Sequence, residues 1–321
     1  MDRSVSHRAA VGPAERTQKS LLRRLLGKYH VYGVFWYKLH FFAVRAVPKW
    51  LYPVLLPTFV AFFFVALRSV RRAITSNLEV VLGPCGFLER QRRIWRNLWV
   101  YSWCLTERYE ALATGRLVET DNEGWEHWRR LNESGQGFVL ATAHIGPWEA
   151  GSAYPADVAG RTIHIVREEE INREAQEFFE EMLSTRARDR YRVHFANRSP
   201  DLGPRLLRAL RRGDIVALQS DRAAHGGRTL QVELFDRPFT MPIGAAIMAR
   251  TAEVPILPVF LYRTGRMRAR LVFHPPIHVE RDGDRDESMR RALSALGRTV
   301  ETAIRRDPCQ WFCFRPLWPD D

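Results

Sequence analysis

The sequence predicts an α/β fold, in which a mixed, mostly parallel sheet is flanked by helices and preceded by an N-terminal helical membrane anchor. From about Gly135, short β-rich runs alternate with amphipathic helical segments. The strand-like runs are apolar along their length, which is typical of a sheet covered on both faces. Before them, the 18 residues from Trp50 to Leu67 carry no charge and lie between basic residues.

The uncharged run sets the expected division of the 321-residue chain. We expect a flexible basic tail over 1–27, a membrane-anchoring helical segment over 28–72 and a large folded domain over 73–321. The tail lacks the apolar stretch of a secretory signal, so we do not interpret it as one.

The anchoring segment has features of both a transmembrane and an interfacial helix. Eighteen uncharged residues are at the lower limit for spanning a bilayer, and Pro53 and Pro57 remove backbone donors. The aromatic residues Trp36, Tyr37 and Trp50 suit the headgroup region. Spanning the membrane, lying in it and forming a buried helical hairpin all stay open. Basic residues flank both ends, so charge does not set an orientation.

Hydrophobic spacing defines the elements expected after the anchor. Residues 68–113 have apolar residues at helical intervals, interrupted at Gly83–Gly86. Beyond Gly135, apolar runs of strand length alternate with helical patterns. The expected strands are 137–143, 161–166, 214–219, 255–262 and 269–274, and the expected helices are 170–186, 202–212, 243–252 and 286–306.

Charge and cysteine content restrict the partners. The net charge of +13 favours an anionic partner, such as nucleic acid, anionic lipid or an acidic carrier protein. Arginine supplies most of this charge and suits forked binding of phosphate or carboxylate, although a GC-rich genome would also enrich it. The four cysteines form no C-x2-C pair. We therefore expect reduced thiols in the cytoplasm and no metal site.

The segment most indicative of chemistry is 138–151, FVLATAHIGPWEAG. An apolar strand ends at Ala143 and is followed by His144, a short turn, and Glu149 in the first turn of the next helix. This turn can bring the His144 ring against the Glu149 carboxylate, which would orient the imidazole as a general base. Ligands usually bind at the carboxyl ends of strands in such sheets. The spacing alone is weak, because it arises often by chance.

The sequence HIGPWE resembles the H-x4-E block of the lipid A late acyltransferases, within the lysophospholipid acyltransferase superfamily. Other segments resemble that family in order and spacing over about residues 70–318. They are Asn77-Leu78, Val166-Arg167, Arg186, LQSDR at 218–222, LFDRPFTMPIGAAIMART at 234–251, VPILPVFLYR at 254–263, Gln310-Trp311 and Arg315. The chain departs from the family pattern at Pro147, Glu168 and Arg222, which puts the acceptor in doubt more than the chemistry.

The resemblance implies that residues 73–321 are a catalytic domain. His144 would deprotonate an acceptor hydroxyl, which would then attack a thioester carbonyl, and Glu149 would orient His144. It implies no metal and no bound cofactor, since the acyl thioester is itself a substrate.

Four further residues are expected to bind substrate. Arg167 and Arg186 would hold a phosphate or similar anion, because a guanidinium pairs bidentately with such groups; the alternative is a salt bridge with the acidic residues at 168–170. Asp221 follows a buried strand and is a site residue or a turn cap. Arg237 is the fourth candidate.

The implied protein is a membrane-associated O-acyltransferase. It would move a fatty acyl chain from acyl carrier protein or acyl-CoA to a hydroxyl of a lipid or glycolipid, as in lipid A biosynthesis. The resemblance implies a monomer on the bacterial inner membrane, with its catalytic domain facing the cytoplasm.

Two alternatives have distinct consequences. A His/Glu-dependent lipid or thioester hydrolase would need an aqueous pocket but no apolar run. A non-catalytic basic protein that binds membranes or nucleic acid would interleave exposed aromatic and basic residues. No nucleic-acid-binding motif is evident and the aromatic residues gather in the apolar run, so we expect no nucleic acid partner.

Overall fold

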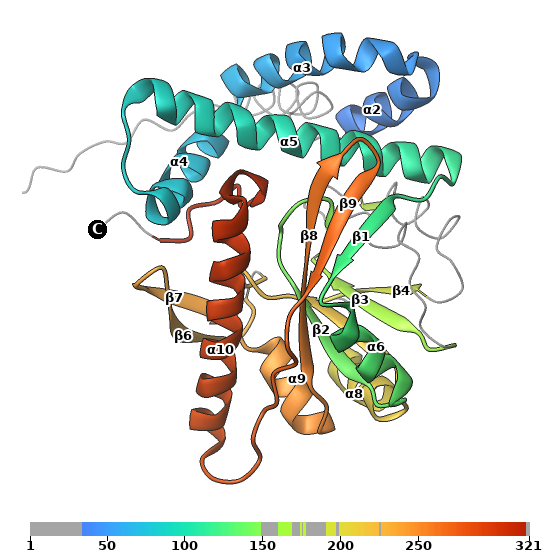
Figure 1. Ribbon diagram of the computed structural model, residues 1–321, viewed down its shortest axis with the longest axis vertical. Coiled ribbons are helices and arrows are strands. Elements are labelled where there is room, and N and C mark those ends of the chain that lie inside the picture. Colours follow the sequence, from blue (N-terminus) through green and yellow to red (C-terminus); the bar gives the residue numbers. More distant parts are fainter. Residues whose placement is uncertain are drawn as a thin grey trace, which may run out of the picture.

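A seven-stranded sheet forms the centre of the protein, in the order β1-β9-β8-β2-β5-β3-β4 (Figure 1). The computed structural model describes residues 34–148, 160–168, 174, 176, 177, 191–196, 199–224 and 226–318. Neighbouring strands pair in parallel, except β8 with β9. The strands are β1 (Glu119–Glu123), β2 (Phe138–Thr142), β3 (Ile163–Arg167), β4 (Tyr191–Phe195), β5 (Ile215–Gln219), β8 (Ile256–Gly265) and β9 (Arg268–Phe273).

Helices cover both faces of this sheet, because successive residues of the central strands point to opposite sides. Val139 and Val216 pack in a large core with residues of α8, α9 and α10. Phe138 and Ile215, one residue earlier in each strand, pack in a second core with Trp128 of α6. The expected mostly parallel α/β sheet is therefore confirmed. The helices are α6 (Trp125–Glu133), α8 (Leu202–Arg211), α9 (Gly244–Ala252) and α10 (Arg285–Arg306).

The N-terminal part forms a separate helical layer across the end of the β8–β9 hairpin (Figure 1). The long helix α5 is its centre, and α2, α3 and α4 pack along it. The interior of the layer is apolar and includes Val60, Ile74 and Leu98. Its elements are α2 (Val34–Ala46), η1 (Lys49–Leu51), α3 (Tyr52–Ala66), α4 (Arg68–Leu82) and α5 (Phe87–Thr114).

One side of α3 is packed and the other is open. Leu56 and Val60 are buried, whereas Phe62 and Val65 are 51% and 75% exposed. Lys49–Ala66 is long and apolar enough to cross a membrane by length and by its mean hydropathy of 1.6, and 17% of it is buried. Within the described residues this is the single stretch that passes that test.

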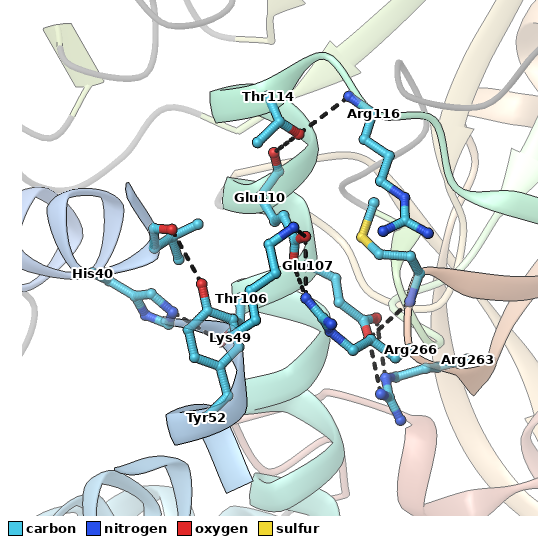
Figure 2. Close-up of polar contacts among 12 residues, drawn as sticks. His40, Lys49, Tyr52, Thr106, Glu107, Glu110, Thr114, Arg116, Arg263 and Arg266 are labelled. Carbon is cyan, nitrogen blue, oxygen red and sulfur yellow. Dashed lines mark hydrogen bonds and ion pairs between the residues drawn. The ribbon is translucent and has the colours of Figure 1, made fainter. Parts of the chain in front are cut away.

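A buried ionic network joins this layer to the β8–β9 hairpin (Figure 2). Glu107 of α5 accepts hydrogen bonds of 3.0 and 2.8 Å from two nitrogens of Arg263. One turn along α5, Glu110 pairs with Lys49 at 2.7 Å and with Arg266 at 2.9 Å. The two glutamates are only 4% and 1% exposed. Because each carboxylate is matched by a cation, the network holds η1 and the hairpin against α5.

Most expected elements are found within a few residues of their expected bounds. The elements that the sequence analysis did not anticipate are β1, β4, α6 and a two-stranded antiparallel sheet of β6 (Thr229–Leu234) and β7 (Arg237–Pro242). The helix expected over 170–186 lies almost entirely outside the described residues. The expected boundary after residue 72 falls within α4, which runs on to Leu82; the division into tail, anchor and catalytic domain stays a prediction.

Candidate active site

Two neighbouring parallel strands bring His144 and Asp221 together. Strands β2 and β5 are in register, with Thr142 opposite Gln219. The N–H of Ser220 donates to the carbonyl of Thr142 at 2.8 Å, which extends the pairing one step beyond the strands. His144 and Asp221 each follow the last residue of their strand by two positions. They therefore meet at the carboxyl edge of the sheet.

The two side chains are directly hydrogen bonded. His144 Nδ1 lies 2.8 Å from Asp221 Oδ1, and the backbone N–H of His144 donates to Oδ2 at 3.1 Å. The indole N–H of Trp311 also donates to Oδ2, at 2.9 Å. His144 is 3% exposed and Asp221 is fully buried. The carboxylate is thus held by three donors from two distant parts of the chain.

This environment keeps Asp221 ionised. Burial by itself raises the pKa of this carboxyl, but His144, Arg222 and Trp311 together outweigh burial and lower the pKa from 3.8 to about 2. An ionised carboxylate only accepts hydrogen bonds, so Nδ1 of His144 carries a proton. In the neutral ring, Nε2 is then the basic nitrogen.

A glycine sets the turn after His144. Gly146 has a φ of +56°, and a Cβ atom there would lie 2.2 Å from the carbonyl oxygen of Leu261. Its N–H donates to the carbonyl of Gln310 at 2.9 Å, and the N–H of Phe312 donates to the carbonyl of His144 at 2.7 Å. The turn is therefore clamped between strand β8 and the segment around Trp311.

Two buried asparagines of the helical layer hold that C-terminal segment. Asn97 of α5 donates to the carbonyls of Cys309 and Trp311 at 3.0 and 2.9 Å. Asn77 of α4 donates to the carbonyl of Cys313 at 3.1 Å. Since Trp311 donates to Asp221, the helical layer supports the dyad through this segment. The family-like residues Asn77 and Trp311 thus have a structural explanation here.

Arg167 lies in the neighbourhood of the dyad. The Trp148 ring packs edge-on against the His144 ring, with centroids 4.8 Å apart. The guanidinium of Arg167, at the carboxyl end of β3, lies 6.0 Å from the centre of the same Trp148 ring. A cation therefore lies next to the Trp148 ring, which itself packs on the imidazole; the anion-binding role of Arg167 stays a prediction.

The other expected site residues are placed differently. Arg237 begins β7 and lines a cavity with arginines of α4; His144 and Asp221 are not among the described residues that line it. Glu149 and Arg186 lie outside the described residues, so their roles stay predictions. Within the described ranges, no group of three or more His, Cys, Asp or Glu side chains is arranged to hold a metal ion.

The sequence analysis missed the direct contact between His144 and Asp221, and the donor Trp311. Asp221 was expected to bind substrate, whereas in the structure its carboxylate bonds the histidine. One available signal was that each residue lies two positions after the end of its strand. Two such strands can be neighbours in a sheet that is covered on both faces. Nothing comparable marked Trp311 as a donor to Asp221. Its position depends on the hydrogen bonds by which Asn97 and Asn77 hold the C-terminal segment.

Comparisons with known proteins identify the family of this chain. The family model described as bacterial lipid A biosynthesis acyltransferase matches residues 22–319. A phosphatidylinositol mannoside acyltransferase from Mycobacterium tuberculosis is 26% identical over 296 residues, covering 87% of this chain and 86% of that protein. The crystal structure of the 1-acyl-sn-glycerophosphate acyltransferase PlsC from Thermotoga maritima matches with a TM-score of 0.35 and 13% identity, over 78% of this chain and 96% of that one, a likeness too low to add to the assignment. The family model covers most of the chain, which therefore belongs to the bacterial lipid A biosynthesis acyltransferase family and is an acyltransferase.

Proposed function

We propose that this acyltransferase moves a fatty acyl group from a carrier thioester to a hydroxyl of a glycolipid, with His144 as general base and Asp221 as its positioning residue. The observation that carries the mechanism is the 2.8 Å contact between His144 Nδ1 and the buried carboxylate of Asp221. The donor is acyl carrier protein or acyl-CoA, and the reaction uses no metal or bound cofactor.

The chemistry follows from the tautomer that Asp221 sets. Nε2 of His144 takes the proton of the acceptor hydroxyl as its oxygen attacks the thioester carbonyl carbon. The negative Asp221 stabilises the imidazolium that forms. When the tetrahedral intermediate collapses, the C–S bond breaks and the thiolate takes the proton from Nε2. The products are an oxygen ester and a free thiol, and His144 is again neutral.

The remaining site residues have supporting roles in this proposal. Arg167, close to Trp148 and His144, holds an anionic group of the acceptor or the donor. Arg186 is proposed to do the same. Glu149 is proposed to help orient His144. Because Nδ1 bonds Asp221 and Nε2 is the proposed base, Glu149 would do so through neighbouring groups rather than by a hydrogen bond to the ring.

The enzyme is proposed to work on the cytoplasmic surface of the bacterial inner membrane, with α3 lying in the membrane. Helix α3 alone has 15 residues and is about 22 Å long, shorter than a hydrocarbon core of about 30 Å; the 18-residue apolar stretch includes the 3-10 turn η1 before it. Its buried side packs on α5, and the opposite side presents Phe62 and Val65. A helix with one side on protein and one apolar side exposed suits the interface better than a lone span.

The acceptor class is supported by the names of the relatives. The family is described by lipid A biosynthesis and the Mycobacterium relative by phosphatidylinositol mannoside. Both are phosphate-bearing glycolipids, and the excess positive charge of this chain suits such acceptors.

The test is an acyl-transfer assay with detergent-purified protein. Radiolabelled acyl-carrier-protein and acyl-CoA thioesters are offered with a lipid A precursor, with phosphatidylinositol mannoside and with a plain phospholipid as acceptors. Wild type is expected to label a glycolipid, and His144→Ala is expected to lose at least about 10³-fold in rate while unfolding at the same temperature.

Each other outcome has a clear meaning. Transfer that survives in folded His144→Ala protein contradicts the proposed base. Release of free fatty acid with no labelled acceptor identifies a hydrolase instead. As a matched control, His127→Ala removes a histidine on α6, away from the dyad, and is expected to leave the rate unchanged.

A further inference from the structure

The cavity that Arg237 lines has a volume of about 1030 Å³ and lies between α4, the start of α5 and the start of β7. Its charge is strongly one-sided, since one glutamate faces five arginines there. The hydroxyls of Thr75 and Ser76 add neutral donors. Its charged lining residues are Arg68, Arg71, Arg72, Arg90, Arg237 and Glu79.

Two of the five guanidinium groups are used within the protein. Arg71 donates to backbone carbonyls at the end of α3, one of them that of Val65 at 3.0 Å. Arg90 pairs with Glu79 at 3.1 Å. For the other three arginines, no carboxylate of the described residues lies within ion-pairing distance. These three are Arg68, Arg72 and Arg237, and all are exposed.

The position of these arginines favours an anion. Helix α4 begins at Arg68, has no acidic residue in its first turn and has no side-chain cap on its N-terminus. The positive end of the helix dipole therefore adds to the charges of Arg68 and Arg72 instead of offsetting them. Arg237 brings a further positive charge from a distant part of the chain. A phosphate would relieve this repulsion and pair bidentately with the guanidinium groups.

The surroundings of the cavity indicate where that phosphate is carried. Helix α3 ends with the exposed Phe62 and Val65, a few residues before the lining residue Arg68. The start of α5 exposes Phe87 and Leu88, which are 70% and 82% accessible and come just before the lining residue Arg90. Exposed apolar side chains next in sequence to basic cavity residues suit the edge of a bilayer, where phosphates lie just above the acyl chains.

We propose that this cavity binds the headgroup phosphate of an anionic phospholipid, as a site separate from the acyl-transfer dyad. The proposal rests on the membrane-surface location proposed for α3, but not on the chemistry of His144. The cavity and the dyad are connected: Trp318 lines the cavity, and its ring centroid is 6.3 Å from that of Trp311, which bonds Asp221. Occupation of the cavity would fix the height of the dyad above the bilayer.

The test is flotation of the full-length protein with two kinds of vesicle. One kind is pure phosphatidylcholine and the other contains phosphatidylglycerol. The cavity variant replaces Arg68, Arg72 and Arg237 by Gln, and the matched control replaces three exposed arginines of α10 by Gln. The control positions are Arg285, Arg290 and Arg298, which likewise have no carboxylate partner among the described residues.

Both variants lose three positive charges. A difference between them in vesicle binding therefore distinguishes binding in the cavity from a general effect of surface charge. The cavity variant is expected to bind phosphatidylglycerol vesicles on the order of 10- to 100-fold more weakly, since each basic residue near an anionic surface contributes measurably. The control is expected to stay within about threefold of wild type, and neither variant should change in its binding to phosphatidylcholine. Arg237→Gln alone, a change at one exposed strand end, provides a second variant should the triple variant unfold early in a thermal melt.

Two results would overturn the proposal. Equal losses by the cavity variant and the α10 control mean that diffuse charge drives binding. A raised KM for a soluble acyl-CoA donor, with vesicle binding unchanged, means that the cavity holds the phosphates of the donor instead. His144→Ala protein is expected to float as wild type does. Flotation therefore tests the lipid site, and the acyl-transfer assay tests the catalytic proposal independently.

Discussion

Among the residues that the structure describes, carboxylates are buried in two places, and their partners differ in whether they exchange a proton near neutral pH. Asp221 accepts hydrogen bonds from His144 and Trp311 at the carboxyl edge of the sheet. Glu107 of α5 accepts two from Arg263 and one from the backbone N–H of Met267, at 3.1 Å, against the β8–β9 hairpin. Both side chains are at least 95% buried. Each carboxylate joins segments that are distant in the sequence.

The partner decides what each carboxylate can do. An arginine stays charged throughout the working pH range, so the Glu107 pair can only hold the β8–β9 hairpin on α5. A histidine gains and loses a proton near neutral pH, so the Asp221 pair can take part in proton transfer. Burial and hydrogen bonding alone therefore do not point to a role in catalysis; a partner that exchanges a proton does.

The largest expected effect is on catalysis, from Asp221→Asn. The asparagine oxygen can still accept from Trp311, and its NH₂ group then faces Nδ1 of His144. That donor forces Nδ1 to become the acceptor and places the ring proton on Nε2, the wrong nitrogen for a base. We expect the rate of acyl transfer to fall on the order of 10³- to 10⁴-fold, with the fold retained.

The measurement is the steady-state rate together with near-UV circular dichroism of the same sample. A rate within tenfold of wild type in folded Asp221→Asn protein would show that His144 does not depend on this carboxylate. The matched control is Glu107→Gln, the same change of carboxylate to amide at the second buried site.

For Glu107→Gln the effect is expected on stability rather than on rate. The change leaves the guanidinium of Arg263 without a charged partner in a largely buried position, which costs about 3 kcal/mol. Urea unfolding in detergent should show this loss, while the activity per folded molecule stays within about twofold. The exposed pair of Glu119 and Arg268 offers a comparison, and Glu119→Gln is expected to leave stability unchanged.

The smallest expected effect is on stability in acid. The pKa of Asp221 is lowered from 3.8 to about 2 in the folded protein, so the folded state favours the ionised carboxylate. This contribution of about 2 kcal/mol is fully present above pH 3.8 and is lost as the pH falls from there through about 2. Unfolding free energies measured down this range should decline less steeply for Asp221→Asn than for wild type. Parallel slopes for the two proteins would mean that other carboxyls dominate acid unfolding.

Elements with a strong hydrophobic period were predictable from the sequence, and polar or irregular ones were not. Strand β1 reads Glu-Thr-Asp-Asn-Glu and lies at the sheet edge. Two of its carboxylates pair with arginines of β9, as Asp121 does with Arg270 at 2.8 Å, a cross-strand match that periodicity cannot reveal. The β6–β7 turn has Phe235 and Asp236 with φ of 55° and 57°. Neither residue is a glycine or asparagine, so the usual hairpin signal was missing.

The part of the site that lies within one short segment was predictable, and the contacts between distant segments were not. His144 was identifiable because strand, turn and helix follow each other within a few residues. Asp221 was found as a residue of interest, but its role depends on which strand lies next to β2. Strand order is set by crossovers that single-sequence patterns do not encode. The position of Trp311 depends further on the hydrogen bond from Asn97, and no sequence pattern marked Asn97 as a site residue.

The dyad is assembled from residues far apart along the chain, and this bears on when during folding the histidine becomes oriented. Asp221 is 77 positions from His144 and 90 from Trp311. Contacts of such long range form late in folding, after the intervening loops have closed. A nascent, clipped or misfolded chain therefore has a histidine with no set tautomer. Only the finished fold orients the ring for the proposed proton transfer.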